Sequence, residues 1–411
     1  MPSESFTWRY SLWVVGFVAA VWLTCFHFPI VWVATGIGEA NRPFLDLYAL
    51  LAGCDAVKLG LNPLLPNLLD PYNRPFGFSD WWFELARLGW GRKDTLWLGM
   101  VLAVTTLVAA VALVRPANRR ERWMLGLLLV SPALLLAVYR ANQDLVVFLL
   151  VSLGLVCFRG SGRPARALGV LLFAAAAVLK YFPLVTLVLL LDFRTRRGVL
   201  AGFALYAVVL LLAWPGLEPA LKLASRHAPS PEWLYAFGAP MLGRDFGLAS
   251  WLGWLVPAAL MAAWAVREAW PHVQSAPVGQ PDARSSAERE FICGAVMIVG
   301  VFFLGVSYLY KLVFALWLLP WLWQQCGGGV VEARWGRVTS RLLLVVVWLE
   351  GGMAVVLNLL VGPWSQPVAV GLLKGTLLIT QLCTWALVAC LLRFLLIYVA
   401  RRGRALLAAP A

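Results

Sequence analysis

The chain has 411 residues, of which 62% are hydrophobic and 13% are charged, and its formal net charge is +14 at pH 7. Soluble globular domains carry about 25% charged residues, so this composition excludes a soluble globule. It predicts an all-α, polytopic helical membrane protein. The arginines concentrate in short loops, which is typical of cytoplasmic connections between membrane segments, so no nucleic-acid partner is expected.

About twelve apolar segments, several of them short, are bounded by charges or by Gly and Pro residues. They lie at residues 10–34, 95–114, 123–139, 144–158, 167–179, 183–193, 199–215, 246–266, 291–307, 312–325, 342–361 and 369–399. The first is interpreted as an uncleaved span, because its apolar run is too long for a signal peptide.

A cytoplasmic N-terminus places every arginine cluster on the cytoplasmic side of the membrane. These clusters lie at residues 115–122, 159–166, 194–197, 334–341 and 401–404. The same topology leaves the long loop 35–94 and the loop 216–245 outside the cytoplasm, and residues 267–290, rich in Pro and Ser, are predicted to be a flexible cytoplasmic loop. We therefore expect one integral domain over residues 1–411, located in the plasma (inner) membrane.

The outer loop contains a predicted short helix over residues 42–55, opened by Pro43. Asp46 lies in its first turn, where a carboxylate could act as a general base or simply be stabilised by the helix dipole. Asp55 has Lys58 three residues later and is interpreted as half of a structural ion pair. Further on, Asp70 to Trp82 mixes turn formers, aromatics and charges, which is typical of a sugar site and also of an interfacial anchor.

Lys180 interrupts an apolar stretch that has arginines on both sides, so the chain is predicted to enter the membrane, turn and return. Each arm of about 12 or 13 residues reaches roughly 19 Å into a hydrocarbon core of about 30 Å, so the turn should lie below the outer surface. A lysine at such depth indicates a polar cavity. The alternatives are a lysine that extends to the surface or one that pairs with a buried carboxylate.

Two further short hairpins repeat this pattern. The turn after residues 123–139 carries Arg140, Asn142 and Gln143, and the turn after residues 291–307 carries Tyr308, Tyr310 and Lys311. Three hairpins that each direct a cation outward predict a common site for an anion such as a lipid phosphate.

Several short motifs resemble family 87 of the C-type, polyprenol-phosphate-dependent glycosyltransferases, which includes mycobacterial and corynebacterial mannosyltransferases. The matching pieces, spread over residues 40–325, are Phe44-Leu45-Asp46-Leu47-Tyr48 with Leu50 to Gly53, the turn Asn142-Gln143-Asp144, the run from Ala174 to Pro183, and the run from Ser307 to Pro320. Two departures stand out. Lys311 lies where relatives usually have an arginine, and Ser79-Asp80 lie where relatives often have Tyr-Pro.

The resemblance implies a membrane enzyme that transfers one sugar, a mannose-like hexose, from a polyprenyl-phosphate donor to a lipid or glycan acceptor on the extracytoplasmic side, with inversion. Asp46 matches the catalytic aspartate of the family. The expected substrate-binding residues are Arg74, Asp80, Arg140, Asn142, Gln143, Lys180, Tyr181, Tyr308, Tyr310 and Lys311. The seven scattered cysteines and three distant histidines form no metal-ligand pattern, so neither a metal nor a cofactor is expected.

Two other functions stay open at this point. A chain with about twelve segments and buried charges could be a transporter or lipid flippase, although a transporter should have related halves and the loop 35–94 has no counterpart in the second half. A non-catalytic protein that binds polyprenyl lipids would tolerate Asp46→Asn, whereas the enzyme would lose its base.

Overall fold

The computed structural model describes residues 8–27, 43–160, 162–193, 195–226, 235–245, 247–249, 251–274, 286–327, 330–360 and 367–408. The structure is about 83% helical, in agreement with the predicted all-α class. The elements are α1 (Trp8–His27), α3 (Leu45–Lys58), η1 (Asp80–Phe83), α4 (Glu84–Arg87), η2 (Arg92–Asp94), α5 (Thr95–Val114), α6 (Arg119–Leu129), α7 (Pro132–Arg140), α8 (Asp144–Arg159), α9 (Arg163–Leu179), η3 (Phe182–Asp192), α10 (Arg196–Arg226), β1 (Ala236–Phe237), α11 (Met241–Asp245), η4 (Trp251–Leu255), α12 (Val256–Gln274), α13 (Ser286–Leu304), β2 (Ser307–Tyr308), η5 (Leu309–Leu318), α14 (Leu319–Cys326), α15 (Val330–Leu360) and α16 (Pro367–Ala408).

Among the described residues, four helical stretches are long and apolar enough to cross a membrane: Arg92–Val114, Arg196–Pro219, Ala333–Leu357 and Gly371–Leu407. The pair α6 and α7, bent by 52° at its break, would make a fifth. These lengths are compatible with a helical membrane protein. The other predicted segments are shorter or broken, so twelve spans stay a prediction.

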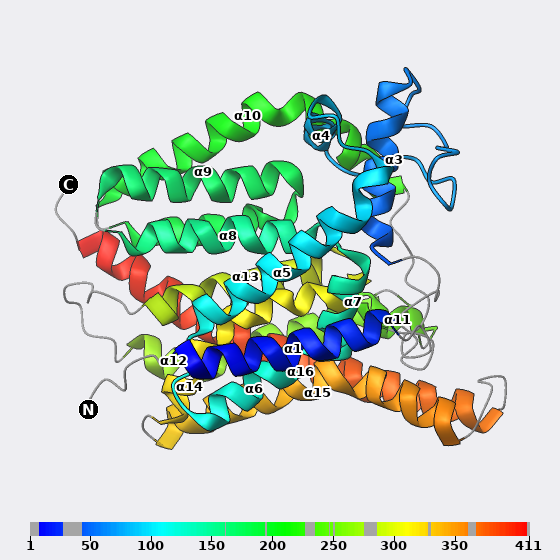
Figure 1. Cartoon of the computed structure of the whole chain (residues 1–411). Helices are drawn as coiled ribbons and strands as arrows, with labels where there is room; N and C mark the ends of the chain where they lie inside the picture. The colour runs from blue at the N-terminus through cyan, green and yellow to red at the C-terminus, as the bar shows by residue number, and fades with distance from the viewer. Residues whose placement is uncertain are drawn as a thin grey trace.

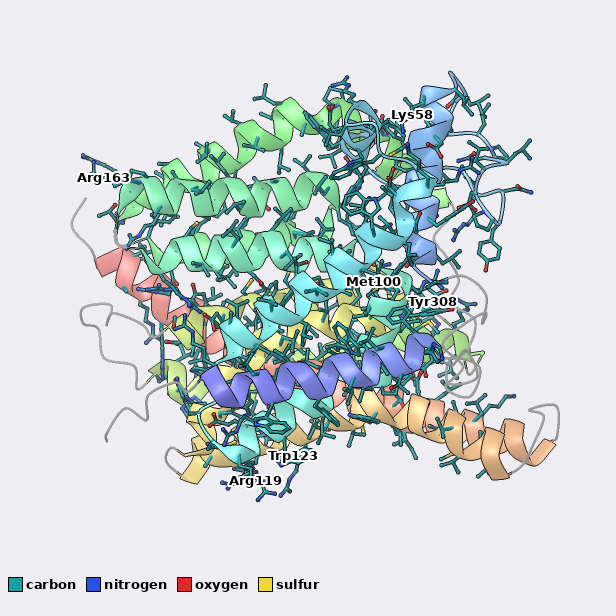
Figure 2. The ribbon with its side chains drawn as sticks, in the orientation of Figure 1. Lys58, Met100, Arg119, Trp123, Arg163 and Tyr308 are labelled. Carbon is teal, nitrogen blue, oxygen red and sulfur yellow. The ribbon has the colours of Figure 1, made fainter. Side chains whose placement is uncertain are left out.

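The helices form a bundle whose two ends are formed by different elements. In the orientation of Figure 2, the basic residues Arg119 and Arg163 lie toward the left, whereas Lys58 and Tyr308 lie toward the right. Figure 1 shows α3 and α4 at the right as well, with α8, α9 and α10 side by side at the upper left. We call the left side the arginine-rich end, and the right side, formed by α3, η1, α4 and the turns at 140–144, 180–182 and 307–311, the loop end.

The arginine-rich end is held together by ion pairs rather than left as separate basic loops. Asp192, at the end of η3, contacts Arg402 of α16 at 2.8 Å and Arg289 of α13 at 3.3 Å. Arg159 of α8 pairs with the buried carboxylate of Glu290. These pairs join elements from the middle and the end of the sequence.

The predicted arm 123–139 consists of two helices, α6 and α7, rather than one. Ser131 accepts a hydrogen bond from the Leu134 backbone N–H and Pro132 occupies the first turn, so a new helix begins there at an angle to α6. The second arms of the other two hairpins contain 3₁₀ helix, in η3 and η5. A 3₁₀ helix rises about 2.0 Å per residue, so a short arm reaches further than the α-helical estimate.

Two predicted loop boundaries are also corrected. The outer loop expected from residue 216 begins later, because α10 continues through Pro215 and Pro219 to Arg226. The helix also gains contacts from the loop end, since Trp81 Nε1 donates to the Ala213 carbonyl at 3.2 Å and Ser79 Oγ to the Gly216 carbonyl at 3.5 Å.

The predicted cytoplasmic loop 267–290 is helical at both flanks, through Gln274 in α12 and from Ser286 in α13, while residues 275–285 lie outside the described residues. The composition of this segment did not predict a helix, because the contacts that stabilise the end of α12 come from a distant helix, α16. Arg393 contacts His272 at 2.9 Å, and Arg404 donates to the Val273 carbonyl at 2.5 Å. Donors of this kind satisfy the last carbonyls of a helix.

Helices α8 and α9 approach closely at two facing glycines. A Cβ built on Gly154 would lie 3.3 Å from the Gly169 carbonyl oxygen and would overlap the Phe173 ring, and one on Gly169 would lie 3.0 Å from the Gly154 carbonyl oxygen. Small residues are common where membrane helices pack backbone to backbone. This contact sets the spacing of α8 and α9, whose loop-end termini carry Asp144 and Lys180.

We expect Gly169→Ala to destabilise the protein by about 1–3 kcal/mol, because the added methyl group overpacks the α8–α9 contact. Gly126→Ala is the matched control, since a Cβ there meets no atom within 4 Å and alanine favours the helix. Thermal unfolding in detergent micelles measures both. Equal melting temperatures for the two variants would contradict the assigned packing.

Candidate functional site

Asp46 is positioned by a contact between the start of α3 and the end of α7. Phe44 adopts a left-handed backbone (φ 62°) before α3, and its N–H donates to the Tyr139 carbonyl at 2.6 Å. Ala141 is also left-handed (φ 42°) and ends α7. This hydrogen bond places residue 46 beside residue 140. The helix begins at Leu45, two residues after the proline that was expected to open it.

The Asp46 carboxylate is held by side chains from the 140–144 turn. Arg140 donates to both of its oxygens, from Nη2 at 2.6 Å and from Nε at 3.0 Å, in the two-point geometry of a strong ion pair. Asn142 Nδ2 donates to the carboxylate at 2.5 Å, and Gln143 Nε2 donates to the Asp46 backbone carbonyl at 3.2 Å. Asp46 is therefore fixed in position and only 8% exposed.

Two opposing effects act on the pKa of Asp46. Burial raises the pKa of this carboxyl, but the charge of Arg140 and the hydrogen bonds from Arg140 and Asn142 outweigh burial, so the pKa lies below its ordinary value. Asp46 is thus ionised at neutral pH. While Arg140 holds it, it is also a weak base.

Lys180 and Lys311 converge on a second carboxylate, Asp144, at the first residue of α8. Lys180 Nζ lies 2.6 Å from Asp144 Oδ1, and Lys311 Nζ lies 2.8 Å from Asp144 Oδ2. Asp144 has no exposed surface. Lys180 Nζ also lies 3.4 Å from Asn142 Oδ1, which joins the two carboxylate clusters through one side chain.

Both interpretations of Lys180 hold at once. It pairs with a buried carboxylate, and it also lines a cavity.

Aromatic rings surround the three cations. Lys311 Nζ lies 3.9 Å above the Phe182 ring centre, and the Arg140 guanidinium lies 5.8 Å from that of Tyr308. Tyr308 and Tyr310 stack with ring centres 5.3 Å apart. Cation–π contacts of this kind stabilise charges that are partly removed from water.

A two-stranded pairing fixes the third turn against the rest of the loop end. Strand β2 pairs antiparallel with β1, with Ala236 opposite Tyr308 and Phe237 opposite Ser307. Gly238 (φ 142°) lies so close to the Gly305 carbonyl that a side chain would overlap it. The position of Tyr308 therefore depends on a segment about 70 residues earlier in the chain, a separation typical of non-local pairing.

Asp46, the three cations and the rings of Phe182, Tyr308 and Tyr310 line one cavity of about 470 Å³ at the loop end. A volume of this size lies within the roughly 300–1,000 Å³ of small-molecule sites. The lining residues are Asp46, Arg74, Gly77, Phe78, Ser79, Arg140, Asn142, Gln143, Leu179, Lys180, Tyr181, Phe182, Leu217, Leu221, Val301, Leu304, Gly305, Val306, Ser307, Tyr308, Tyr310 and Lys311. We call it the cationic cavity.

The structure thus brings together ten of the eleven residues predicted for the site, and Asp80 is the exception. Arg74 lines the cavity, but both Nε and Nη2 donate to the Asp70 carboxylate, at 3.1 and 3.0 Å. Asp80 faces a different cavity, described below. Asp55 pairs with Lys58 as predicted (3.6 Å), and also with Arg92 (2.9 Å).

Two residues that contact the cations of the site, Asp144 and Phe182, were not predicted. Asp144 was noted only as part of a turn, although two buried lysines at hairpin turns require a carboxylate and Asp144 is the acidic residue in those turns. Phe182 gave no signal, because an aromatic residue beside a proline is common in apolar segments. Only the fold reveals that its ring lies under Lys311.

Among the described residues, no group of three or more His, Cys, Asp or Glu side chains could hold a metal ion. No protein-family model matches the chain, and neither does any curated protein or solved structure. The geometry of the cationic cavity is therefore the main basis for a functional proposal.

We expect Arg140→Gln to destabilise the protein, toward the lower end of the about 3–5 kcal/mol typical of breaking a buried pair, since the Arg140 side chain is 20% exposed. Because the folded-state pKa of Asp46 is lowered, its pairing contributes stability above the ordinary carboxyl pKa of about 4 and loses it as pH falls further. The difference in stability between the wild type and the variant should therefore be full at pH 7 and shrink toward pH 3.

Thermal unfolding in micelles from pH 3 to pH 8 measures this difference. Arg87→Gln is the control, because Arg87 is 79% exposed in an ion pair with Glu84 and should contribute little at any pH. A destabilisation by Arg140→Gln that is equally large at pH 3 and pH 7 would show that Arg140 acts through packing rather than through the Asp46 charge.

Proposed function

We propose that this protein is a membrane glycosyltransferase that transfers a single sugar, a mannose-like hexose, from a polyprenyl-phosphate donor to a lipid or glycan acceptor on the extracytoplasmic side of the plasma membrane. The resemblance to family 87 of the C-type glycosyltransferases motivates the proposal. One observation carries it: the Asp46 carboxylate and the cations of three separate turns line the same cavity.

The charges of the site match a phosphodiester. Asp46 and Asp144 oppose Arg140, Lys180 and Lys311, which leaves one net positive charge for the one negative charge of a polyprenyl-phosphate sugar. When the bond between the sugar and the phosphate breaks, the departing oxygen gains negative charge. Lys180 and Lys311 would stabilise that charge more strongly in the transition state than in the bound donor, which is the condition for catalysis.

Asp46 would become an effective base only when Arg140 is drawn away. In the resting site, Arg140 donates to both Asp46 oxygens and lines the cavity at the same time. A donor phosphate would compete with Asp46 for the guanidinium, because guanidinium binds phosphate and carboxylate in the same two-point geometry. Loss of that partner would raise the basicity of Asp46 once the donor is in place.

The transfer itself balances without further groups. The acceptor hydroxyl gives its proton to Asp46, and its oxygen forms a bond to the anomeric carbon from the face opposite the phosphate. The bond from that carbon to the phosphate oxygen breaks, and polyprenyl phosphate leaves with the electron pair. The anomeric configuration inverts.

We expect Asp46→Asn to lower the rate of sugar transfer by about 10²- to 10⁴-fold, because the amide cannot accept the proton. The assay uses radiolabelled polyprenyl-phosphate mannose, purified protein in lipid nanodiscs and a mixed acceptor extract. Asp55→Asn is the matched control: the residue is on the same helix but is not among the residues that line the cationic cavity.

An unchanged rate of sugar transfer in Asp46→Asn would show that a different residue is the general base. No transfer by the wild type with any polyprenyl-phosphate sugar would contradict the proposal and favour a transporter, a lipid flippase or a non-catalytic polyprenyl-binding protein.

We expect Lys180→Gln to raise the KM for the donor by about tenfold, a loss of one charge-assisted contact to phosphate. The fold should persist, because Lys311 still neutralises Asp144 at 2.8 Å. Initial rates over a range of donor concentrations separate KM from kcat. A KM for the donor and a kcat that are both unchanged in Lys180→Gln would show that this residue does not contact the phosphate.

A further inference from the structure

A second cavity, of about 500 Å³, also lies at the loop end, where α3, η1 and α4 meet the far part of α10. It is lined by Val57, Lys58, Asp80, Trp81, Phe83, Glu84, Ala86, Arg87, Leu212, Pro215 and Gly216. The proposed transfer reaction as described above uses none of these residues. We call it the neutral cavity.

The two cavities share a wall. In the segment before η1, Ser79 lines the cationic cavity and its neighbour Asp80 lines the neutral one. On α10, Leu217 lines the cationic cavity and its neighbour Gly216 lines the neutral one. Ser79 Oγ donates to the Gly216 carbonyl at 3.5 Å across this wall. The neutral cavity is therefore adjacent to the proposed donor site but separate from it.

Charge distinguishes the two cavities. Two cations, Lys58 and Arg87, and two carboxylates, Asp80 and Glu84, line the neutral cavity, so its formal charge is zero. Both cations are already engaged. Lys58 Nζ donates to the Gly89 and Trp90 carbonyls at 3.0 and 2.6 Å, and Arg87 pairs with Glu84 at 2.6 Å. The neutral cavity thus offers no net positive charge to a phosphate, unlike the cationic cavity.

Trp81 provides a fixed aromatic surface in the neutral cavity. Its Nε1 donates to the Ala213 carbonyl at 3.2 Å, and Gly216 leaves just enough room for that edge of the indole, since a Cβ there would lie 3.0 Å from Nε1. The side chain is nevertheless 42% exposed. An indole held at one edge and open elsewhere offers a flat apolar surface for the C–H face of a pyranose ring.

Asp80 supplies polar capacity beside this ring. Its Oδ1 is buried and accepts no hydrogen bond from any described residue, which is a costly arrangement for a carboxylate. Burial also raises the pKa of the Asp80 carboxyl. Hydroxyl groups of a sugar could provide the missing partner, and the exposed Glu84 and Arg87 could bind further hydroxyls.

We propose that the neutral cavity binds an uncharged pyranose unit of the acceptor glycan, stacked on Trp81 and hydrogen-bonded to Asp80. The assignment to the acceptor rests on the proposed function, whereas the binding of a neutral sugar does not. Val57 lies eleven residues after Asp46 on α3, which places the cavity about 16 Å from the base along the helix. This distance exceeds one sugar ring, so an extended acceptor would reach both places and a monosaccharide would not.

The test is a binding measurement that needs no turnover. Saturation-transfer NMR detects linear manno-oligosaccharides of one to four units on the wild-type protein in nanodiscs, and titration gives the Kd. We expect the longest oligosaccharide to bind Trp81→Leu at least about tenfold more weakly, and Asp80→Asn several-fold more weakly. Asp46→Asn is measured as well, because it distinguishes binding at the neutral cavity from binding at the cationic cavity.

Trp97→Leu is the matched control, because Trp97 is 46% exposed and its Nε1 is hydrogen-bonded to Asp94, but it does not line the cavity. Asp80→Asn is nearly isosteric and decides the question if Trp81→Leu fails to fold. Binding that is absent, or equal in wild type, Trp81→Leu and Asp80→Asn, overturns the proposal. So does binding that depends on Asp46 alone.

The two proposals fail separately. Transfer activity without oligosaccharide binding that depends on Trp81 would overturn the sugar site and leave the glycosyltransferase standing. Oligosaccharide binding that depends on Trp81, in a protein without transfer activity, would support the sugar site and overturn the glycosyltransferase proposal.

Discussion

The loop end depends on the pairing of three cations, one buried and two partly buried, with two buried carboxylates. Arg140, Lys180 and Lys311 lie on three different turns, and each reaches Asp46 or Asp144 within 3 Å. Removing one partner of such a pair leaves an uncompensated charge, which costs several kcal/mol. The ion pairs therefore fix the positions of the three turns relative to one another and to α3. The same pairing leaves one net positive charge facing a cavity. Structural constraint and proposed phosphate binding thus come from one set of residues.

Much of this site could be predicted from sequence, because hydropathy and charge are local properties. The apolar arms on either side of Arg140, Lys180 and Lys311, together with their arginine-rich flanks, predicted three turns at one end of the molecule. The pairing within the site could not be predicted. Which carboxylate meets which cation depends on the Phe44–Tyr139 hydrogen bond and on the pairing of β1 with β2, contacts between segments distant in the chain. Nor could the sequence show that Ser79 and Asp80, which are neighbours in the chain, face different cavities.

The incorrect element boundaries have a similar cause. Proline and charge were interpreted as helix ends near Pro215 and Pro271, but α10 and α12 continue past these prolines, whereas Pro132 was interpreted as lying inside one arm. Side chains of distant elements contact both helices near these prolines: Arg404 donates to the Val273 carbonyl at the end of α12, and Trp81 donates to the Ala213 carbonyl of α10. At Pro132 the break is real, since Ser131 caps a new helix there.

A cryo-EM structure of the protein in nanodiscs with polyprenyl phosphate tests the central claim most directly. The account predicts the phosphate in the cationic cavity, within hydrogen-bond distance of Lys180 and of an Arg140 that no longer donates to both Asp46 oxygens. A phosphate bound at the arginine-rich end, or a cationic cavity that stays unchanged with Arg140 still on Asp46, would contradict it.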